Sequence, residues 1–128
     1  MSALARFAAC VLAAWAGAAS AAAEPYVVCD NGLRCVRAPC PTKNVLDFAS
    51  GAVVRVTGVD LARLEPPDRE RMRRGSAADD GSHVLEGAVV DTIVEVGGKA
   101  QPAPLFVVTR IVRAATDAER LQCRDGEK

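Results

Sequence analysis

The chain has 128 residues, with 16 basic and 16 acidic side chains and a formal net charge of zero at pH 7. Such a chain has no overall positive field to draw it to nucleic acid or to an anionic membrane, so nucleic acid is not an expected partner. Half of the residues are hydrophobic, and a chain of this length suits one domain with a single core.

Residues 1–23 have the three parts of a removable export signal. Arg6 ends a short first region, residues 7–19 are uncharged and rich in alanine, and Ala21-Ala22-Ala23 supplies the small side chains that signal peptidase accepts. The apolar run is too short to span a bilayer, so no stable membrane insertion is expected after cleavage. The alternative is a buried alanine-rich helix, which the charge of Glu24 just past the cleavage site disfavours. We therefore expect export to the periplasm or secretion into the medium.

The exported part is predicted to be a single disulfide-stapled domain over residues 24–123, followed by a polar tail over residues 124–128. Loss of Arg6 with the signal changes the net charge from zero to −1. The sequence contains no internal repeat and no sign of a second domain. We expect a monomer that binds no cofactor and no metal.

Four cysteines remain once Cys10 is removed with the predicted signal. An even number of cysteines in an exported chain favours two disulfides. The four are Cys29, Cys35, Cys40 and Cys123. Three pairings are possible. If Asn31-Gly32 forms a two-residue hairpin turn, Cys29 and Cys35 point to opposite sides of a sheet and cannot bond, which favours Cys29–Cys123 with Cys35–Cys40. Without this turn the pairing stays open.

The first part of the exported chain is predicted to form short strands. The β segments cover residues 26–30, 33–37, 44–48 and 52–59. Two prolines between residues 38 and 41 exclude a regular strand or helix there. Asp60 is placed to cap a single helical turn over residues 61–64.

Two helices are predicted further along the chain. Residues 67–74 begin with proline and an acidic side chain and end with arginines, which is typical of a short surface helix. Thr116-Asp117-Ala118-Glu119 matches a capping box, so a terminal helix is expected to start there and to carry Cys123. Residues 76–82 are small and polar and are predicted to be a flexible link.

The longest predicted strands lie between these two helices. Residues 84–96 are rich in valine, leucine and isoleucine, and their alternation changes phase near Asp91, which indicates a bulge or bend. Gly97-Gly98 ends this strand. Residues 105–112 are apolar on both faces, as expected of a central strand.

The order of these elements predicts an α+β, mostly β fold. Three or so short strands, a helix, two long strands and a final helix suit a small curved antiparallel sheet or barrel with one inserted short helix. The oligonucleotide/oligosaccharide-binding (OB) barrel has this plan, and the chain resembles it in element order alone. A fold of this kind supports many functions, so the likeness implies none of them.

The segment from Arg34 to Thr42 combines two arginines, two cysteines and two prolines. A loop stiffened by a disulfide and by prolines loses little conformational entropy on binding, which favours recognition. The candidate recognition residues are Arg34, Arg37, Ala38, Pro39 and Pro41. Arg37 could fill the specificity pocket of an enzyme, as basic side chains do in protease-inhibiting loops. The alternative is a covalent corner that only joins two strands.

Two other groupings suggest a metal site or a catalytic centre. Zinc ligation by Cys29, Cys35, Cys40 and His83 is disfavoured, because these cysteines lack the short paired spacing of structural zinc sites and export favours oxidation. His83 is the only histidine and follows Ser82, but neighbours on a strand point apart, and no G-x-S-x-G motif is present. A structural or exposed histidine is expected, and no catalytic, cofactor-binding or metal-binding residue is predicted.

The remaining charged clusters are interpreted as solvated surface. Asp79-Asp80-Gly81 lacks the spaced carboxylates and the distal glutamate of a calcium loop, so a turn is expected. Arginines alternate with Asp68 and Glu70 in the predicted surface helix, which is typical of an exposed face with local ion pairs. A docking patch for an acidic partner is the alternative for these arginines, which are Arg69, Arg71, Arg73 and Arg74.

Four stretches together resemble small exported bacterial domains of uncharacterised function. They are Cys35-Val-Arg-Ala-Pro-Cys-Pro-Thr42, Gly58-Val-Asp-Leu-Ala-Arg-Leu64, Val84-Leu-Glu-Gly-Ala-Val89 and Leu105-Phe-Val-Val-Thr109. The resemblance covers most of the exported part and implies no catalytic residue. We therefore expect an exported, non-enzymatic binding or structural module with an unknown protein or small-molecule partner. The alternative is an inhibitor of a secreted or periplasmic hydrolase that acts through the Arg37 loop.

Overall fold

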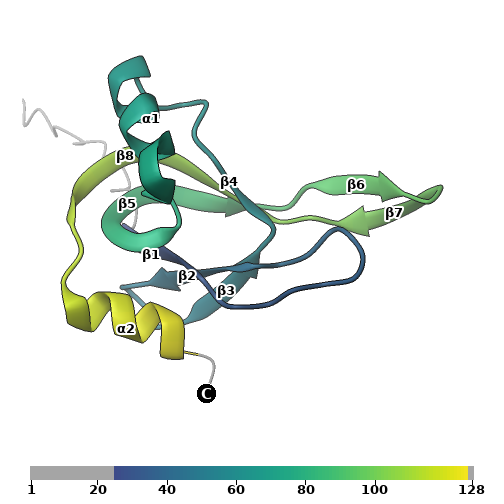
Figure 1. Cartoon of the computed structure of the whole chain (residues 1–128), viewed down its shortest axis with the longest axis horizontal. Coiled ribbons are helices and arrows are strands. Elements are labelled where there is room, and N and C mark those ends of the chain that lie inside the picture. The colour runs from purple at the N-terminus through teal and green to yellow at the C-terminus, as the bar shows by residue number, and fades with distance from the viewer. Residues whose placement is uncertain (1–24, 127–128) are drawn as a thin grey trace, which may run out of the picture.

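The computed structural model describes residues 25–126 as a strongly curved sheet with two helices and a projecting hairpin (Figure 1). The main sheet has six strands in the order β3-β2-β1-β5-β8-β4, and β6 and β7 form a separate two-stranded sheet. The predicted export signal, Cys10 and the last two residues of the chain lie outside the described residues.

The elements have the following bounds. The main sheet contains β1 (Pro25–Asp30), β2 (Lys43–Asp47), β3 (Val53–Val56), β4 (Gly58–Asp60), β5 (Asp80–Val90) and β8 (Leu105–Ala114). The projecting hairpin consists of β6 (Ile93–Val96) and β7 (Lys99–Pro102). The helical elements are α1 (Pro66–Arg73), a 3-10 turn η1 (Arg74–Ser76) and α2 (Asp117–Asp125).

One continuous chain segment supplies both edge strands of the main sheet, β3 and β4. β3 pairs antiparallel with β2, and β4 pairs in parallel with β8, although only Thr57 separates β3 from β4. The backbone N–H and the hydroxyl of Thr57 both donate to the carbonyl of Pro104, at 2.8 and 2.9 Å. These hydrogen bonds stabilise the bend at which the chain passes from one edge of the sheet to the opposite edge.

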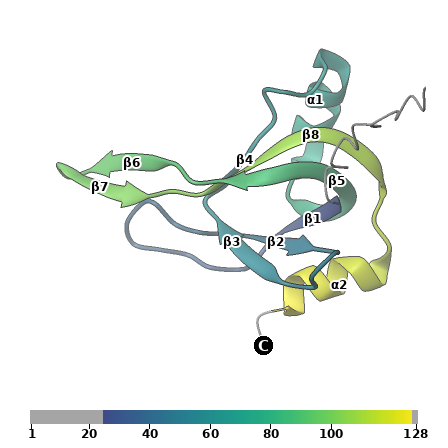
Figure 2. The same cartoon turned by 180° about the vertical axis from the view of Figure 1, so that it is seen from behind.

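The sheet therefore curls back on itself as a barrel, with α1 inserted between β4 and β5 (Figures 1 and 2). The predicted α+β, mostly β fold, a small curved sheet or OB-like barrel with one inserted short helix, is confirmed. The parallel β4–β8 pair departs from the expected antiparallel pairing. It arises because the third strand of the barrel continues past Thr57 into a second partner.

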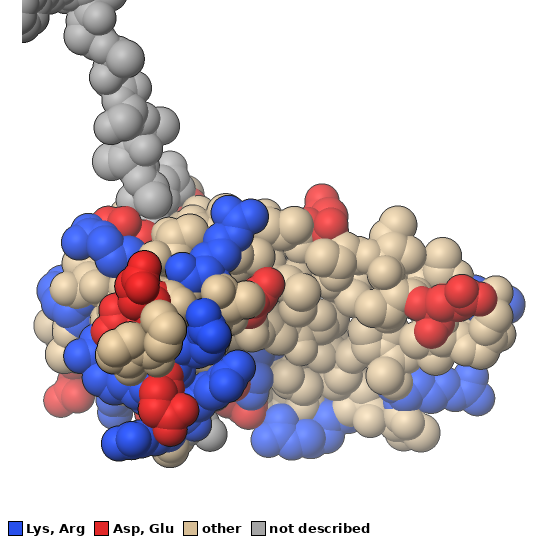
Figure 3. All heavy atoms as spheres, turned by 90° about the horizontal axis from the view of Figure 1, so that it is seen from above, with Lys and Arg blue, Asp and Glu red and all other residues tan. Residues whose placement is uncertain are grey.

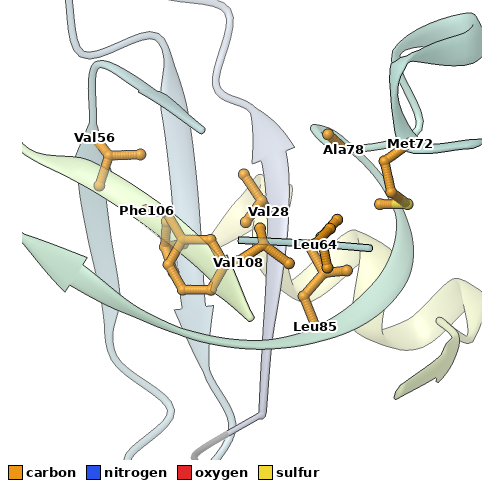
Figure 4. Close-up of a cluster of buried hydrophobic side chains, with 9 residues drawn as sticks. Val28, Val56, Leu64, Met72, Ala78, Leu85, Phe106 and Val108 are labelled. Carbon is orange, nitrogen blue, oxygen red and sulfur yellow. The ribbon is translucent and has the colours of Figure 1, made fainter. Parts of the chain in front are cut away.

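The main core fills the barrel and is closed at one end by α1. Phe106 of β8 has no exposed surface, and its ring meets the ring of Tyr26 edge-on at a centroid distance of 5.1 Å. Met72 is the buried residue of α1 and packs into the same cluster (Figure 4). The buried members are Val28, Val45, Val56, Leu64, Met72, Ala78, Leu85, Phe106 and Val108. The predicted surface helix thus contributes one buried apolar side chain, while its charged residues except Arg69 are directed to solvent.

A second, smaller core lies between the main sheet and α2. Cys29 of β1 and Cys123 of α2 are both buried there and are joined by a disulfide, with their Cα atoms 6.2 Å apart. Asn44 is buried beside them and donates from Nδ2 to the carbonyl of Cys123 at 3.1 Å. The cluster is formed by Val27, Cys29, Leu46, Val84 and Cys123. The predicted pairing of Cys29 with Cys123 is confirmed, and it ties α2 to the sheet.

The helix α2 begins at the predicted capping box. Thr116 Oγ1 accepts from the backbone N–H of Glu119 at 3.2 Å, and Glu119 Oε1 accepts from the backbone N–H of Thr116 at 2.8 Å. Arg113 donates two further hydrogen bonds to Glu119, at 2.7 and 2.8 Å. Arg113, followed by the groups of Thr116, lowers the pKa of Glu119 from 4.5 to about 2. The helix continues to Asp125 and so includes the first two residues of the predicted polar tail.

The lowered pKa of Glu119 predicts a specific acid sensitivity. A carboxylate whose pKa is lower in the folded state stabilises the fold above its unfolded pKa, and this stability is lost as the pH falls towards the folded pKa. Because Arg113 is half exposed, we expect a contribution of about 1 kcal/mol at pH 7 that disappears between about pH 5 and pH 2. Urea unfolding of wild type and Glu119→Gln measures it, since glutamine keeps the capping hydrogen bond. A difference between the two proteins that is as large at pH 2 as at pH 7 would exclude the charge as its source.

Candidate binding groove

The candidate recognition residues lie in a loop over residues 31–42, which connects β1 directly to its ladder partner β2. Asp30 faces Lys43 in the ladder, and the backbone N–H of Asn31 donates to the carbonyl of Thr42 at 2.9 Å. The Asn31 side-chain amide donates to the carbonyl of Pro41 at 2.8 Å, and its oxygen accepts the backbone N–H two residues ahead at 2.9 Å. The side chain of Asn31 therefore braces the base of a wide loop.

The predicted hairpin turn at Asn31-Gly32 is wrong, and residues 33–37 form no strand. The side chain of Asn31 makes the hydrogen bonds that the backbone would make in a tight turn. The chain therefore forms a wide loop after β1 and pairs with β1 again only at β2. The favoured pairing of Cys35 with Cys40 is nevertheless confirmed. Its physical reason differs, since Cys29 is buried in β1 while Cys35 is exposed in the loop.

The tip of the loop is closed by the Cys35–Cys40 disulfide, which spans a sequence separation of 5. Val36 is fully exposed inside this closed tip, at 102% of its reference surface, and Arg37 is exposed beside it. A fully exposed valine gains nothing from burial within the molecule. The tip therefore presents apolar and cationic groups to the outside on a cross-linked backbone.

The base of the loop is an ion-pair network. Lys43 lies 3.2 Å from Asp30 and 3.3 Å from Asp79, and Arg34 lies 3.4 Å from Asp30. The backbone N–H of Gly32, followed by Lys43 and Arg34, lowers the pKa of Asp30 from 3.8 to about 2. Arg34 is thus engaged at the base of the loop, away from the exposed tip.

The projecting hairpin is the second component of the site. Gly97 and Gly98 both have positive φ, 58° and 77°, as a two-residue hairpin turn requires, and the turn pairs Val96 with Lys99. The backbone N–H of Ala103 donates to the carbonyl of Thr92 at 2.7 Å, and the Thr92 hydroxyl donates to the carbonyl of Ala103. These bonds fix the point where the hairpin leaves β5 and β8.

The hairpin was only half predicted. The bend near Asp91 is confirmed, because β5 ends at Val90 and β6 begins at Ile93. The strand β7 was missed, since Lys-Ala-Gln-Pro has little intrinsic preference for a strand. Its extended form depends on pairing with β6 across the two glycines.

The loop and the hairpin extend from the barrel in the same direction (Figures 1 and 2). Together they line a groove of about 830 Å³. The loop contributes Arg37, Ala38 and Pro39, and the hairpin contributes Val96, Gly97, Lys99, Gln101 and Pro102. A volume of this size suits a small ligand or a short segment of chain. We refer to these eight residues as the loop–hairpin groove.

The structure divides the predicted recognition residues into two groups. Arg37, Ala38 and Pro39 line the loop–hairpin groove. Arg34 and Pro41 lie at the base of the loop, where they bond to Asp30 and Asn31. The alternative interpretation of the loop as a covalent corner between two strands stays open, and the loop lines the groove together with the hairpin.

A second hollow of about 540 Å³ lies beside the end of α2. It is lined by Cys29, Asp30, Asn31, Gly32, Asp80, Arg124 and Asp125. Asp30 is paired with Lys43 and Arg34, and Asp80 accepts the backbone N–H of Ser82 at 2.8 Å. Because these carboxylates have partners within the fold, the hollow is a weaker candidate than the groove.

The zinc alternative does not form a site within residues 25–126, whereas the serine and histidine of the catalytic alternative lie in contact. Cys29, Cys35 and Cys40 are all in disulfides, so they cannot ligate zinc with His83. No group of three or more potential metal ligands occurs within residues 25–126. The expectation that Ser82 and His83 point apart is wrong, since Ser82 Oγ lies 2.8 Å from His83 Nδ1. β5 is irregular there, because Gly81 has a φ of 78°, and the short serine side chain reaches the neighbouring ring.

Three arginines of the predicted charged cluster have ion-pair or hydrogen-bond partners close to them in sequence. Arg71 pairs with Asp68 at 3.6 Å and Arg74 with Glu70 at 3.5 Å, as expected of a solvated helix face. Arg69 instead turns inward and donates to the carbonyls of residues 62 and 64. The predicted flexible link over residues 76–82 is wrong at its end, because β5 already begins at Asp80. Figure 3 shows blue and red side chains interleaved at the barrel end, while the part of the molecule that projects from the barrel is mostly uncharged.

Comparisons with known proteins do not place the chain in a family. A scan against protein-family models, a search of curated proteins and a search of solved structures each found no match. Within residues 25–126, neither helix has the length and apolar character that a membrane span requires. The functional assignment therefore depends on the groove and on the sequence features described above.

Proposed function

We propose that the chain is an exported, non-enzymatic binding module whose partner occupies the loop–hairpin groove. Export is supported by the signal-like residues 1–23 and by two disulfides, which persist in oxidising compartments. The likeness of the Cys35–Thr42 motif to small exported bacterial domains points the same way. Membership of that group is part of the proposal.

The observation that carries this proposal is the convergence of two segments distant in sequence. The loop lies between β1 and β2, whereas the hairpin lies between β5 and β8, and both project beyond the barrel to line one groove. Neither segment contributes to the two buried cores. Exposed segments that do not contribute to a protein's own core are candidates for the recognition of another molecule.

Capture experiments with charge-reversed baits test this function. We expect wild-type protein to retain one stoichiometric partner from periplasm or culture medium, and the variant Arg37→Glu/Lys99→Glu to lose it. The matched control is Arg71→Glu/Arg73→Glu on α1, which changes the charge equally but leaves the groove intact. Loss of the partner with the α1 control, or equal retention by the groove variant, would contradict the assignment of the groove.

A second candidate function is inhibition of a secreted or periplasmic hydrolase. The observation that favours it is the exposed Val36-Arg37 pair inside the disulfide-closed tip. We expect the protein to slow trypsin-like proteases stoichiometrically, Arg37→Lys to keep this inhibition and Arg37→Ala to abolish it. Inhibition that survives Arg37→Ala, or none across a protease panel, would remove this candidate for that enzyme class.

A further inference from the structure

Two cations of the loop–hairpin groove have no partner within the described molecule. Arg37 belongs to the loop and Lys99 to the hairpin, and neither has an ion pair or a hydrogen bond within residues 25–126. By contrast, Arg34 and Lys43 at the base of the loop are both paired with Asp30. No carboxylate lines the groove, so its charge complements an anionic ligand.

The lining of the groove disfavours single-stranded nucleic acids as that ligand. Single-stranded nucleic acids are held largely by stacking of their bases on aromatic side chains. The groove is lined by valine, proline, alanine, glycine and glutamine besides the two cations, with no aromatic residue. The aromatic residues in the described part of the chain lie elsewhere: Tyr26, Phe48 and Phe106 belong to the barrel and its cores.

The hairpin offers what an extended polypeptide needs. β6 and β7 each have a single neighbour, so the outer edge of each strand leaves backbone groups unpaired. Val96 and Lys99 flank the two-residue turn and bond to each other, which directs the N–H and C=O of Ala100 outward from β7. An extended segment can bond to this edge at Ala100, whereas Pro102, the next outward-facing residue, offers only its C=O.

Exposed apolar side chains of the loop and the hairpin are available to contact the second face of such an extended segment. Val36 is fully exposed on the loop, and Ile93 of β6 is 74% exposed. Ile93 lies on the face of the hairpin opposite to Lys99, because Lys99 pairs with Val96, three residues further along β6. Side chains of an extended chain alternate between two faces. A segment that alternates acidic and aliphatic residues would therefore place its carboxylates on the face of Lys99 and its aliphatic side chains on the face of Ile93.

We propose that the loop–hairpin groove binds an acidic, extended segment of a partner protein. This inference rests on the proposed binding function and names its partner class. The carboxylates of the segment pair with Arg37 and Lys99, and its backbone adds to the free edge of β7.

A peptide titration tests the proposal directly. Mature protein labelled with nitrogen-15 is titrated with a peptide of alternating aspartate and valine, and the amide shifts are mapped. We expect shifts over residues 35–40 and 93–102. Arg37→Gln and Lys99→Gln should each raise the Kd about threefold, and the double variant about tenfold. Arg71→Gln on α1, whose arginine is paired with Asp68, is the matched control and should leave the Kd unchanged.

Three other probes separate this inference from the proposed function. Equal binding of a lysine–valine peptide, or an unchanged Kd in the double variant, would overturn the acidic-segment proposal. Binding of a sulfated oligosaccharide or a thymidine oligonucleotide in the groove, without binding of the acidic peptide, would also overturn it, yet would keep the groove as a binding site. Absence of amide shifts in the groove with every probe would overturn the acidic-segment proposal. The proposed binding function is tested separately by the capture experiment.

Discussion

Removal of the Cys29–Cys123 disulfide by replacing both cysteines with alanine is expected to lower the free energy of unfolding by about 4–5 kcal/mol. The bond joins residues separated by 94 positions and therefore restricts nearly the whole described chain in the unfolded state. It also holds α2 over the second core, where both sulfurs are buried. A domain of this size is stable by only about 5–15 kcal/mol, so the variant should be close to unfolded at 37 °C.

The second disulfide provides the control for this prediction. Cys35–Cys40 spans a separation of 5 and lies in an exposed loop, so replacing both cysteines with alanine should cost about 2 kcal/mol. Urea unfolding at 10 °C, followed by circular dichroism, compares the two variants with wild type. A Cys35–Cys40 variant that is destabilised as much as the Cys29–Cys123 variant would contradict the account of how the fold is held together.

Replacement of Phe106 by alanine is the second large effect that we expect, a loss of about 3–5 kcal/mol. Phe106 is completely buried at the centre of the main core and packs edge-on against Tyr26. The deletion leaves a cavity bounded by strands on several sides, and a barrel sheet has little freedom to collapse into it. Phe106→Leu, which fills most of this space, should cost less than about 1.5 kcal/mol. Equal destabilisation by the two variants, measured by urea unfolding, would show that cavity size is not the cause.

The elements with local signals could be predicted from the sequence. The capping box at Thr116 and Glu119 determines where α2 begins, because both hydrogen bonds involve residues three positions apart. The proline and the charge pattern of residues 67–74 indicate α1 for the same reason, and the helix lies over Pro66–Arg73. The order of these elements was sufficient to indicate the fold class, although β4 pairs in parallel with β8.

The elements that depend on distant partners could not be predicted in the same way. Asn31-Gly32 has the composition of a tight turn, yet its asparagine side chain bonds to Pro41 and to Asn44. These partners are brought near only when β1 pairs with β2. The same holds for β7, whose extended form comes from pairing with β6.

The candidate site was therefore only half visible in the sequence. The cysteines and prolines of residues 35–41 indicate a stiff loop, and Arg37, Ala38 and Pro39 do line the groove. The other half, from Val96 to Pro102, carries no chemical motif. Its role follows from the direction in which the hairpin leaves the barrel. Gly97-Gly98, directly after the mostly apolar residues 93–96, was a sequence signal that could have suggested a hairpin there.

The central claim is that recognition takes place in the loop–hairpin groove, and amide hydrogen exchange in the presence of a captured partner tests it most directly. We expect protection to increase at residues 35–40 and 93–102 when the partner binds, while the exposed face of α1 exchanges as before. Protection of α1 or of the end of α2, with the loop and the hairpin unchanged, would contradict the claim.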